Sequence, residues 1–172
     1  MKTIKTTIFA LMLAGSVFSQ KDSIFLYKSV DDMSDDVTYY PSSDVVLSNS
    51  QKTKGVRISA FIDEKKGELS IGDISISMVN IGSCVEKNEL IIMFEDSSKI
   101  SLTSWNKFNC EGNAWFRLED DEVAKLSSLK VKKIKITNGH SYDSYTSLMS
   151  SPDYFRQLFY AAKTKKIKNV KK

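Results

Sequence analysis

The most reactive side chains in this sequence are those of its two cysteines, Cys84 and Cys110. A catalytic disulfide is not indicated, because the C-x-x-C spacing of redox-active pairs is absent. The stretch between the cysteines predicts a β-hairpin, whose two ends return to the same place. We therefore predict a structural disulfide, which would stabilise the fold by about 3–4 kcal/mol in the chain-entropy description. Two separate buried thiols are the alternative.

His140 is the only histidine, which limits the metal and acid–base chemistry open to the chain. A zinc site needs several His or Cys ligands, and both cysteines are assigned to the proposed bridge. A Ser-His-Asp arrangement could form in space, but the sequence holds no G-x-S-x-G elbow. We predict no catalytic residue, no metal site and no cofactor. An enzyme with an unrecognised site near His140 is kept as an alternative.

Aspartates are concentrated in the stretch Asp31–Asp36, a composition that suggests a calcium loop at first sight. An EF-hand loop also needs a glycine for its sharp turn and a glutamate at its twelfth position, and neither is present. Asp and Ser side chains favour turns by bonding to the neighbouring backbone. A simple turn is therefore favoured over a cation site.

Several aromatic residues could line a ligand-binding face: Tyr39, Tyr40, Trp105, Trp115, Tyr142 and Tyr145. In strands, aromatic side chains are more often part of the core or of cross-strand pairs, which is the favoured interpretation. Tyr142 and Tyr145 are the better binding candidates because they fall in the polar segment His140–Met149. We predict this segment to be a surface loop, and loops carry binding residues more often than strands do.

Lysines are crowded at the C-terminus: Lys163, Lys165, Lys166, Lys168, Lys171 and Lys172. A basic tail of this kind could contact nucleic acid or an anionic surface. An exported protein rarely meets nucleic acid, so we predict no nucleic-acid partner and a solvated tail over residues 166–172. The lysines at positions 163, 165, 166 and 168 are the candidates for contact with an anionic surface.

The N-terminus has the order of residues typical of an export signal. Lys2 and Lys5 precede the apolar run Ile8–Ala14, and small residues follow up to Ser19. We predict a cleaved signal peptide over residues 1–19, with cleavage between Ser19 and Gln20. The apolar run is shorter than the roughly 20 residues that a membrane-spanning helix needs. The predicted location is therefore periplasmic or secreted, without a membrane span.

Most of the remaining chain alternates between apolar and polar residues, the period of β-strands. Val56–Ile62 is a clear example, and the same pattern returns in Leu69–Ile71 and Ile74–Met78. The apolar face changes parity at Gly72-Asp73. Because a strand can change face only through a bend or an inserted residue, we predict a bulge or a break at this point.

The hairpin between the cysteines consists of Leu90–Phe94 and Ile100–Trp105, joined by the polar turn Glu95–Ser98. Leu90–Phe94 is apolar on both faces, which predicts the most buried strand. A later strand, Val131–Ile136, has apolar residues on one side and a strongly basic exposed side formed by Lys130, Lys132, Lys133 and Lys135.

Two helices are predicted among the strands. A short one near residues 120–128 begins with acidic residues, which suit a helix N-terminus. The other, near 152–165, begins at Ser150-Ser151-Pro152 and has an apolar stripe at helical spacing. We predict a single mainly β domain over residues 20–165, an antiparallel β-sandwich of about seven or eight strands. The helices would cover one edge or end.

The run Asp32-Met33-Ser34-Asp35, followed by paired strands and a mid-chain cysteine before an apolar strand, resembles a group of exported bacterial domains. These are the VasI-like accessory proteins associated with type VI secretion and secreted relatives with an Asp-x-Met-Ser/Thr-Asp start. The resemblance covers residues 24–137. It implies a β-sandwich that binds protein or envelope partners, and it carries no catalytic residues.

We therefore predict an exported, non-enzymatic interaction module whose partner is an unknown protein or envelope component. Two other hypotheses are kept. One is association with an anionic membrane or envelope polymer through the C-terminal lysines. The other is the enzyme with a site near His140, which would need an acid within hydrogen-bond reach of the imidazole.

Overall fold

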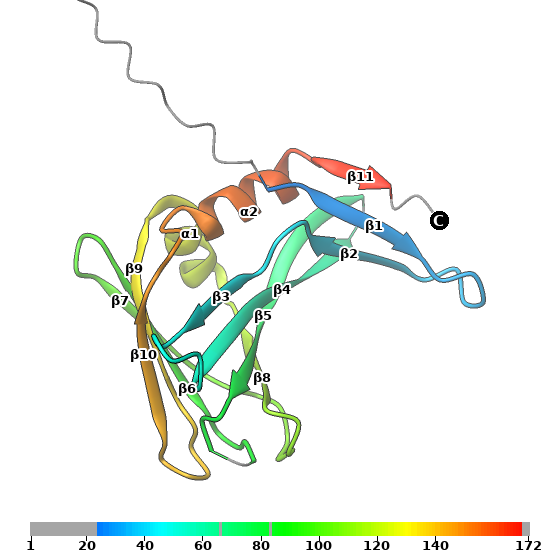
Figure 1. The fold of residues 1–172 in the computed structure, drawn as a ribbon. Helices are drawn as coiled ribbons and strands as arrows, with labels where there is room; N and C mark the ends of the chain where they lie inside the picture. Colours follow the sequence, from blue (N-terminus) through cyan, green and yellow to red (C-terminus); the bar gives the residue numbers. More distant parts are fainter. Residues whose placement is uncertain (1–23, 66, 83, 170–172) are drawn as a thin grey trace, which may run out of the picture.

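The computed structural model describes residues 24–65, 67–82 and 84–169 of the chain (Figure 1). The predicted signal peptide, residues 1–19, lies outside the described residues. Within the described part, the chain is mainly β. Eleven strands form two separate sheets, and two helices lie at one end of them.

The larger sheet has seven strands in the order β11-β1-β2-β4-β5-β8, and β3 pairs with β4 next to β2. Its strands are β1 (Leu26–Val30), β2 (Val37–Pro41), β3 (Val45–Ser48), β4 (Gly55–Lys65), β5 (Glu68–Val79), β8 (Asn113–Arg117) and β11 (Ile167–Asn169). The long hairpin of β4 and β5 forms the middle of this sheet. β3 pairs with the first part of β4, and β2 pairs farther along at Ile62.

The smaller sheet has four antiparallel strands in the order β10-β9-β6-β7. Its strands are β6 (Glu89–Phe94), β7 (Lys99–Thr103), β9 (Val131–Thr137) and β10 (Ser144–Leu148). β6 and β7 are the hairpin predicted between the cysteines. β6 lies in the middle of the sheet, where Ile92 is opposite Ile100 of β7 and Ile134 of β9.

One hydrophobic cluster lies between the two sheets and beneath the helices. Ile74 of β5, Phe116 of β8 and Ile136 of β9 are fully buried in it, and Ile134 is 1% exposed. Each buried side chain of this size contributes about 1.5–3 kcal/mol relative to its exposed state. The alternation read from the sequence therefore marks the inner faces of both sheets.

The helices lie over one end of the space between the sheets, at the top of the view in Figure 1. α1 (Asp120–Ser128) begins where the backbone N–H of Glu119 donates to the carboxylate of Glu122 at 3.0 Å. α2 (Tyr154–Lys163) packs against α1 and β5 with its apolar stripe. Both predicted helices are confirmed, although α2 begins at Tyr154, so that Pro152 lies before its first turn.

The prediction from the sequence gave too few strands and was wrong in expecting all of them to be antiparallel. The described residues form eleven strands, more than the seven or eight expected, and β11 runs parallel to β1, with Leu26 opposite Ile167. The tail expected at residues 166–172 is also partly wrong, because Ile167–Asn169 form β11. This strand was missed because a three-residue segment has no readable period, and its pairing depends on α2 bringing it beside β1.

The predicted irregularity at Gly72-Asp73 is confirmed. Phe61 of β4 is opposite Asp73, whereas the next residue, Ile62, is opposite Ile71, so Gly72 is the extra residue of a β-bulge. The bulge keeps Ile71 and Ile74 buried on the same side of the strand and turns Asp73 to the outer face.

Candidate binding site on the larger sheet

Three aromatic side chains form a row on the outer face of the larger sheet, the face that points away from the core. Phe61 stands on β4, Trp115 on β8 and Trp105 in the connection between β7 and β8. The ring centroids of Phe61 and Trp115 are 6.3 Å apart, and those of Trp115 and Trp105 are 5.4 Å apart. Phe61 is 48% exposed and Trp105 is 53% exposed. We call these three residues the aromatic row.

An acid and an arginine hold one end of the aromatic row. The Oδ1 atom of Asp73 accepts a hydrogen bond from the indole Nε1 of Trp105 at 3.0 Å and a longer one from Nε of Arg117 at 3.4 Å. The guanidinium of Arg117 lies 5.7 Å from the centroid of the Trp105 ring. The Trp105 indole is therefore held in one orientation although half of its surface is exposed.

The register of three strands explains how these side chains meet. Phe61, Asp73 and Arg117 are opposite one another on β4, β5 and β8. The bulge at Gly72 is what places Asp73 on the outer face, because an unbroken alternation with Ile71 would turn it toward the core. The site thus depends on a local irregularity that is visible in the sequence.

Small hydroxyl residues lie beside the aromatic row. Ser75 is opposite Ser59 on one side and Trp115 on the other. Both serines are half-buried, and neither hydroxyl bonds to any of the described residues. Two residues farther along β5, on the same face, Ser77 Oγ donates to the side-chain oxygen of Asn113 at 2.7 Å. The row is thus bordered by hydroxyl groups that can still donate and accept hydrogen bonds.

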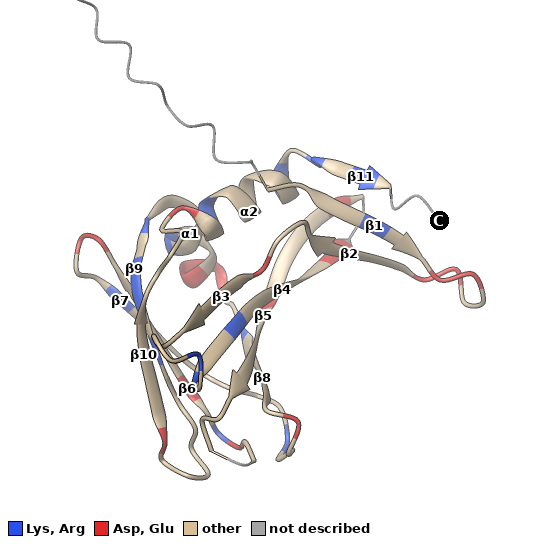
Figure 2. Ribbon diagram, viewed as in Figure 1, with Lys and Arg blue, Asp and Glu red and all other residues tan. Residues whose placement is uncertain are grey.

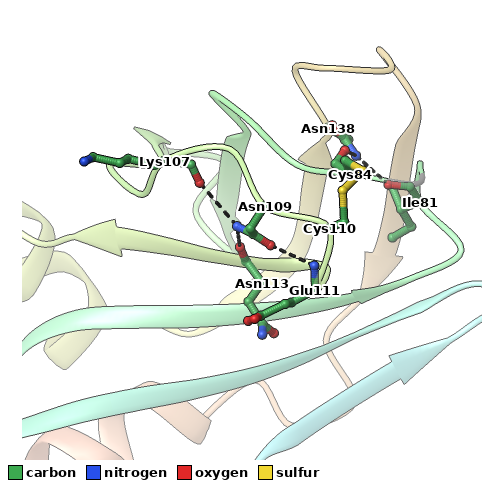
Figure 3. Close-up of a disulfide and its surroundings, with 8 residues drawn as sticks. All are labelled: Ile81, Cys84, Lys107, Asn109, Cys110, Glu111, Asn113 and Asn138. Carbon is green, nitrogen blue, oxygen red and sulfur yellow. Dashed lines mark hydrogen bonds between the residues drawn. A yellow bond between two sulfur atoms is a disulfide. The ribbon is translucent and has the colours of Figure 1, made fainter.

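The predicted disulfide is confirmed: Cys84 and Cys110 are bonded (Figure 3). It joins the connection before β6 to the connection between β7 and β8, the segment that carries Trp105. Val85 and Asn109 also exchange two backbone hydrogen bonds, at 2.7 and 3.1 Å. The disulfide therefore anchors the segment from which Trp105 projects.

Two asparagines complete this anchor. The side-chain Nδ2 of Asn138, which is fully buried, donates to the carbonyl oxygens of Ile81 and Cys84 at 2.8 and 2.7 Å. Asn109 Nδ2 donates to the carbonyl oxygen of Asn113 at 3.0 Å, at the start of β8 (Figure 3). Loops from both sheets are thereby tied together at the end of the molecule opposite the helices (Figure 1).

A shallow groove of about 450 Å³ opens farther along the same outer face, at the end of β4 that pairs with β3. Exposed Val46 and Val79 border it together with Lys52 and Arg57. Lys54, also at its border, forms an ion pair with Asp143 at 3.1 Å. This lysine holds the pKa of the Asp143 carboxyl below its usual value.

A separate cavity of about 440 Å³ is lined by β3 residues and by the start of α2, including Asp44, Tyr154 and Gln157. The Tyr154 side chain is buried, and its hydroxyl has no hydrogen-bond partner among the described residues. Burial raises the pKa of Tyr154 well above its usual value, and the negative charge of Asp44 adds to the effect.

The two tyrosines selected from the sequence have different environments. Tyr142 is 85% exposed in the turn between β9 and β10. Tyr145 is 8% exposed in β10, opposite Ile136, with its ring in the core. The prediction of a loop over His140–Met149 was wrong for Ser144–Leu148, which is a strand. The period was hidden because serine and threonine occupy most of its other positions.

The lysines at positions 163, 165, 166 and 168 lie along the end of α2 and in β11, the region where Figure 2 shows blue segments. Lys163 ends α2, and Lys165 follows with a positive φ of 49°. The Nζ atom of Lys168 lies 3.7 Å from the centroid of the Phe25 ring, a cation–π contact. Lys166 borders a cavity of about 330 Å³ next to α2. These lysines are therefore spread along an ordered edge of the larger sheet.

His140 lies in the turn between β9 and β10. Its ring packs edge-on against Phe108, with the centroids 5.2 Å apart, and its backbone N–H donates to Asn138. No carboxylate or hydroxyl bonds to its imidazole among the described residues. The arrangement therefore offers His140 no acid–base partner there.

The aspartate cluster forms a turn between β1 and β2. Oδ1 of Asp31 accepts hydrogen bonds from the backbone N–H groups of Met33 and Ser34 at 2.8 and 2.9 Å. These bonds hold the pKa of Asp31 below its usual value. Ser34 Oγ donates to Asp36 at 2.7 Å. The carboxylates thus serve the local backbone, as expected for a turn.

The chain matches no protein-family model, no curated protein and no solved structure. The resemblance to VasI-like domains therefore stays a prediction. Neither helix in the described part of the chain is long and apolar enough to cross a membrane.

Sequence reasoning named Trp105 and Trp115 but favoured a core or cross-strand role for them. One signal pointed the other way: Trp105 follows Ser101 and Thr103, which have the parity of the polar face of β7. Phe61 likewise has the outward parity of β4, with Arg57 and Ser59. Single outward aromatics are unremarkable, and only the pairing of β4, β5 and β8 brings these together.

Proposed function

We propose that this protein is an exported, non-enzymatic binding module that contacts its partner through the aromatic row of the larger sheet. The single observation that carries the proposal is the row itself, with Phe61 and Trp105 half exposed on the outer face of the larger sheet. Contiguous exposed aromatic surface is characteristic of interaction sites in folded proteins. Tryptophan and arginine are also the residue types most enriched among those that dominate binding energy.

The orientation of the row supports the same proposal. The bond from Trp105 to Asp73 and the nearby guanidinium of Arg117 hold an exposed indole in place before any partner arrives. Binding then requires little ordering of side chains, which is the main entropic cost at an interface. An indole held in this way is well suited to recognition.

Export is supported by two features. The order of basic, apolar and small residues up to Ser19 is typical of a signal peptide. The disulfide between Cys84 and Cys110 is compatible with an oxidising compartment, where such bonds form and persist. The proposed partner is therefore a component of the envelope or of the surrounding medium.

The test uses the exported protein and an envelope fraction of the cells that produce it. Trp105→Ala and Trp115→Ala are compared with wild type for retention on this fraction. Lys133→Ala, on the outer face of the smaller sheet, is the matched control. We expect each tryptophan variant to lose about tenfold or more in affinity and the control to bind like wild type. Equal retention of all four proteins would contradict the proposal.

The tryptophans also provide a direct readout of the site. The chain has two tryptophans, and both belong to the aromatic row. Intrinsic tryptophan fluorescence therefore reports only on this surface. After subtraction of the emission of the envelope fraction alone, a blue shift is expected if the indoles become covered by a partner. An unchanged spectrum at saturating retention would place the contact elsewhere.

A second candidate function is association with an anionic membrane or envelope polymer through the C-terminal lysines. Exposed Lys163, Lys165 and Lys168 along one edge favour it. Binding to vesicles that contain anionic lipid should then be salt-sensitive and should weaken when these three lysines are replaced by glutamine. Binding that is independent of salt and of these lysines would contradict it.

A further inference from the structure

Resting on the proposed function, we infer that the partner of the aromatic row is a neutral polysaccharide. In this arrangement sugar rings stack on Trp105 and Trp115, whose ring planes are inclined by 33°. Phe61, inclined by 77° to Trp115, contacts the polymer beside them, and sugar hydroxyls bond to the polar groups next to the row. Aromatic faces carry partial negative charge, and the C–H bonds on the flat side of a pyranose carry partial positive charge. The two surfaces are therefore complementary without any formal charge.

The shape of the row fits an elongated ligand. Its rings succeed one another across the strands, from β4 over β5 to β8 and then to the β7–β8 connection. Neighbouring centroids are 6.3 and 5.4 Å apart, close to the length of one sugar unit in a chain. A linear polymer can therefore contact successive rings, whereas a small compact ligand would use only one.

The hydroxyl groups beside the row favour a sugar over a protein as the partner. Ser59 and Ser75 are half-buried, and their hydroxyls bond to no described residue. Covering them with the apolar core of a protein interface would leave polar groups unpaired at a cost in affinity. A sugar has hydroxyls that both donate and accept, so it can satisfy them while its ring face covers the aromatic side chains.

The charge at the site separates a neutral polymer from an anionic one. Asp73 and Arg117 form an ion pair beside the row, and the exposed carboxylate of Asp63 lies two residues after Phe61 on the same face of β4. The charges near the row therefore do not attract an anionic polymer. Oδ2 of Asp73, whose side chain is 17% exposed, accepts no hydrogen bond from the described residues and keeps its capacity to accept one. Three lysines that form no ion pair with the described residues, Lys99, Lys133 and Lys135, lie together on the outer face of the smaller sheet. An anionic polymer would be drawn to that face.

The first measurement is native gel electrophoresis of the exported protein in gels that contain hydroxyethyl cellulose, laminarin or xylan, with alginate as an anionic control. At least one neutral polysaccharide should retard wild type and shift its tryptophan emission to the blue. Trp115→Ala should lose about tenfold or more in affinity. Ser75→Ala, which leaves the aromatic row intact, should lose about threefold by removal of one hydrogen bond. Lys133→Ala should match wild type.

The second measurement repeats the retention assay on the envelope fraction after two separate treatments. Periodate oxidises the vicinal diols of sugars, and protease digests proteins. Retention that protease leaves intact is the expected result, and periodate should abolish it where the polymer carries vicinal diols, as 1,4-linked units do and 1,3-linked units do not. Circular dichroism and thermal unfolding of each variant confirm that a loss of binding is not a loss of fold.

The outcomes separate this inference from the proposed function. Absence of retardation by any neutral polysaccharide, together with retention that protease abolishes and periodate does not, overturns the polysaccharide. If Trp115→Ala still loses that retention, the binding module stands with a protein partner. Retardation by alginate alone overturns the neutral ligand. Equal behaviour of Trp115→Ala and wild type in both assays overturns the inference and the proposed function together.

Discussion

The outer faces of the two sheets are built from the same alternating pattern but carry opposite chemistry. On the larger sheet the outward positions of β4, β5 and β8 hold aromatic and serine side chains around the Asp73–Arg117 pair. On the smaller sheet, Lys133 and Lys99 flank Met93, and Lys135 is opposite Ile91. Figure 2 shows the lysines of β7 and β9 in blue. The two faces are therefore suited to binding partners of different chemistry.

The difference teaches how a face becomes suited to specific binding. Trp105 is held by a hydrogen bond, a cation–π contact and a neighbouring ring, so little side-chain freedom is left for a partner to remove. The lysines of the smaller sheet are opposite half-buried Ile91 and Met93, and lysine stems generally lie along apolar surface while their ammonium groups stay in water. Such lysines keep about 2 kcal/mol of rotamer entropy each, which ordering would cost. The lysine face is therefore better suited to solubility than to specificity.

The largest expected effect comes from removing the disulfide, which ties the segment that carries Trp105 to the connection before β6. The double variant Cys84→Ser/Cys110→Ser should lose about 3–4 kcal/mol in free energy of unfolding, measured by urea denaturation. Hydrogen exchange should rise in the β7–β8 connection, which carries Trp105, and stay low in β9. Equal loss of protection in both sheets would show that the disulfide does not act on the aromatic face in particular.

The next effect is the contribution of the aromatic row to stability. Trp115→Ala removes ring contacts with both Phe61 and Trp105, and each aromatic pair contributes about 0.5–1.5 kcal/mol beyond its buried area. We expect a loss of about 2 kcal/mol in urea denaturation. A double-mutant cycle that combines Trp115→Ala with Trp105→Ala should give a non-zero coupling energy, because the two rings are in contact. Purely additive losses would mean that the row is a set of independent side chains.

A substitution at Tyr154, the first residue of α2, should leave the outer faces of both sheets unchanged. Tyr154→Phe removes a buried hydroxyl without a partner among the described residues, and we expect the free energy of unfolding at pH 7 to rise by up to about 1 kcal/mol. Tryptophan emission and retention on the envelope fraction should not change. A decrease in stability would show that the hydroxyl forms a stabilising bond.

The same variant tests the direction of the Tyr154 pKa. A folded-state pKa above the unfolded value of about 10 gives stability that is complete below that value and is lost as pH rises. Wild type should therefore lose up to about 1.4 kcal/mol per pH unit above pH 10 from this residue, and Tyr154→Phe should lose less. Parallel curves for the two proteins in alkaline urea denaturation would contradict the raised pKa.

The smallest effect is expected on the lysine face. Lys133→Gln/Lys135→Gln removes two exposed like charges from β9, and we expect a change within about 0.5 kcal/mol. Any gain should appear at low ionic strength and disappear at high salt, because these charges are screened by solvent ions. A loss above 1 kcal/mol would mean that the lysine stems contribute more to packing than their exposure indicates.

Local features could be predicted from the sequence because their causes lie within a few residues. The hairpin of β6 and β7, the acidic start of α1 and the bulge at Gly72 all follow from short-range patterns. The disulfide followed from the hairpin, since a hairpin brings its own ends together. The basic outer side of β9 could also be read directly from its lysines.

The tertiary structure decided the rest. Which sheet each strand joins, the parallel pairing of β1 with β11 and the burial of Tyr145 depend on contacts between segments far apart in the chain. The candidate site belongs to this second group. Phe61 and Trp115 are 54 residues apart by number (115 − 61 = 54) and meet only because β5 pairs with both β4 and β8. A period of two shows which way each residue points, but strand pairing alone determines its neighbours.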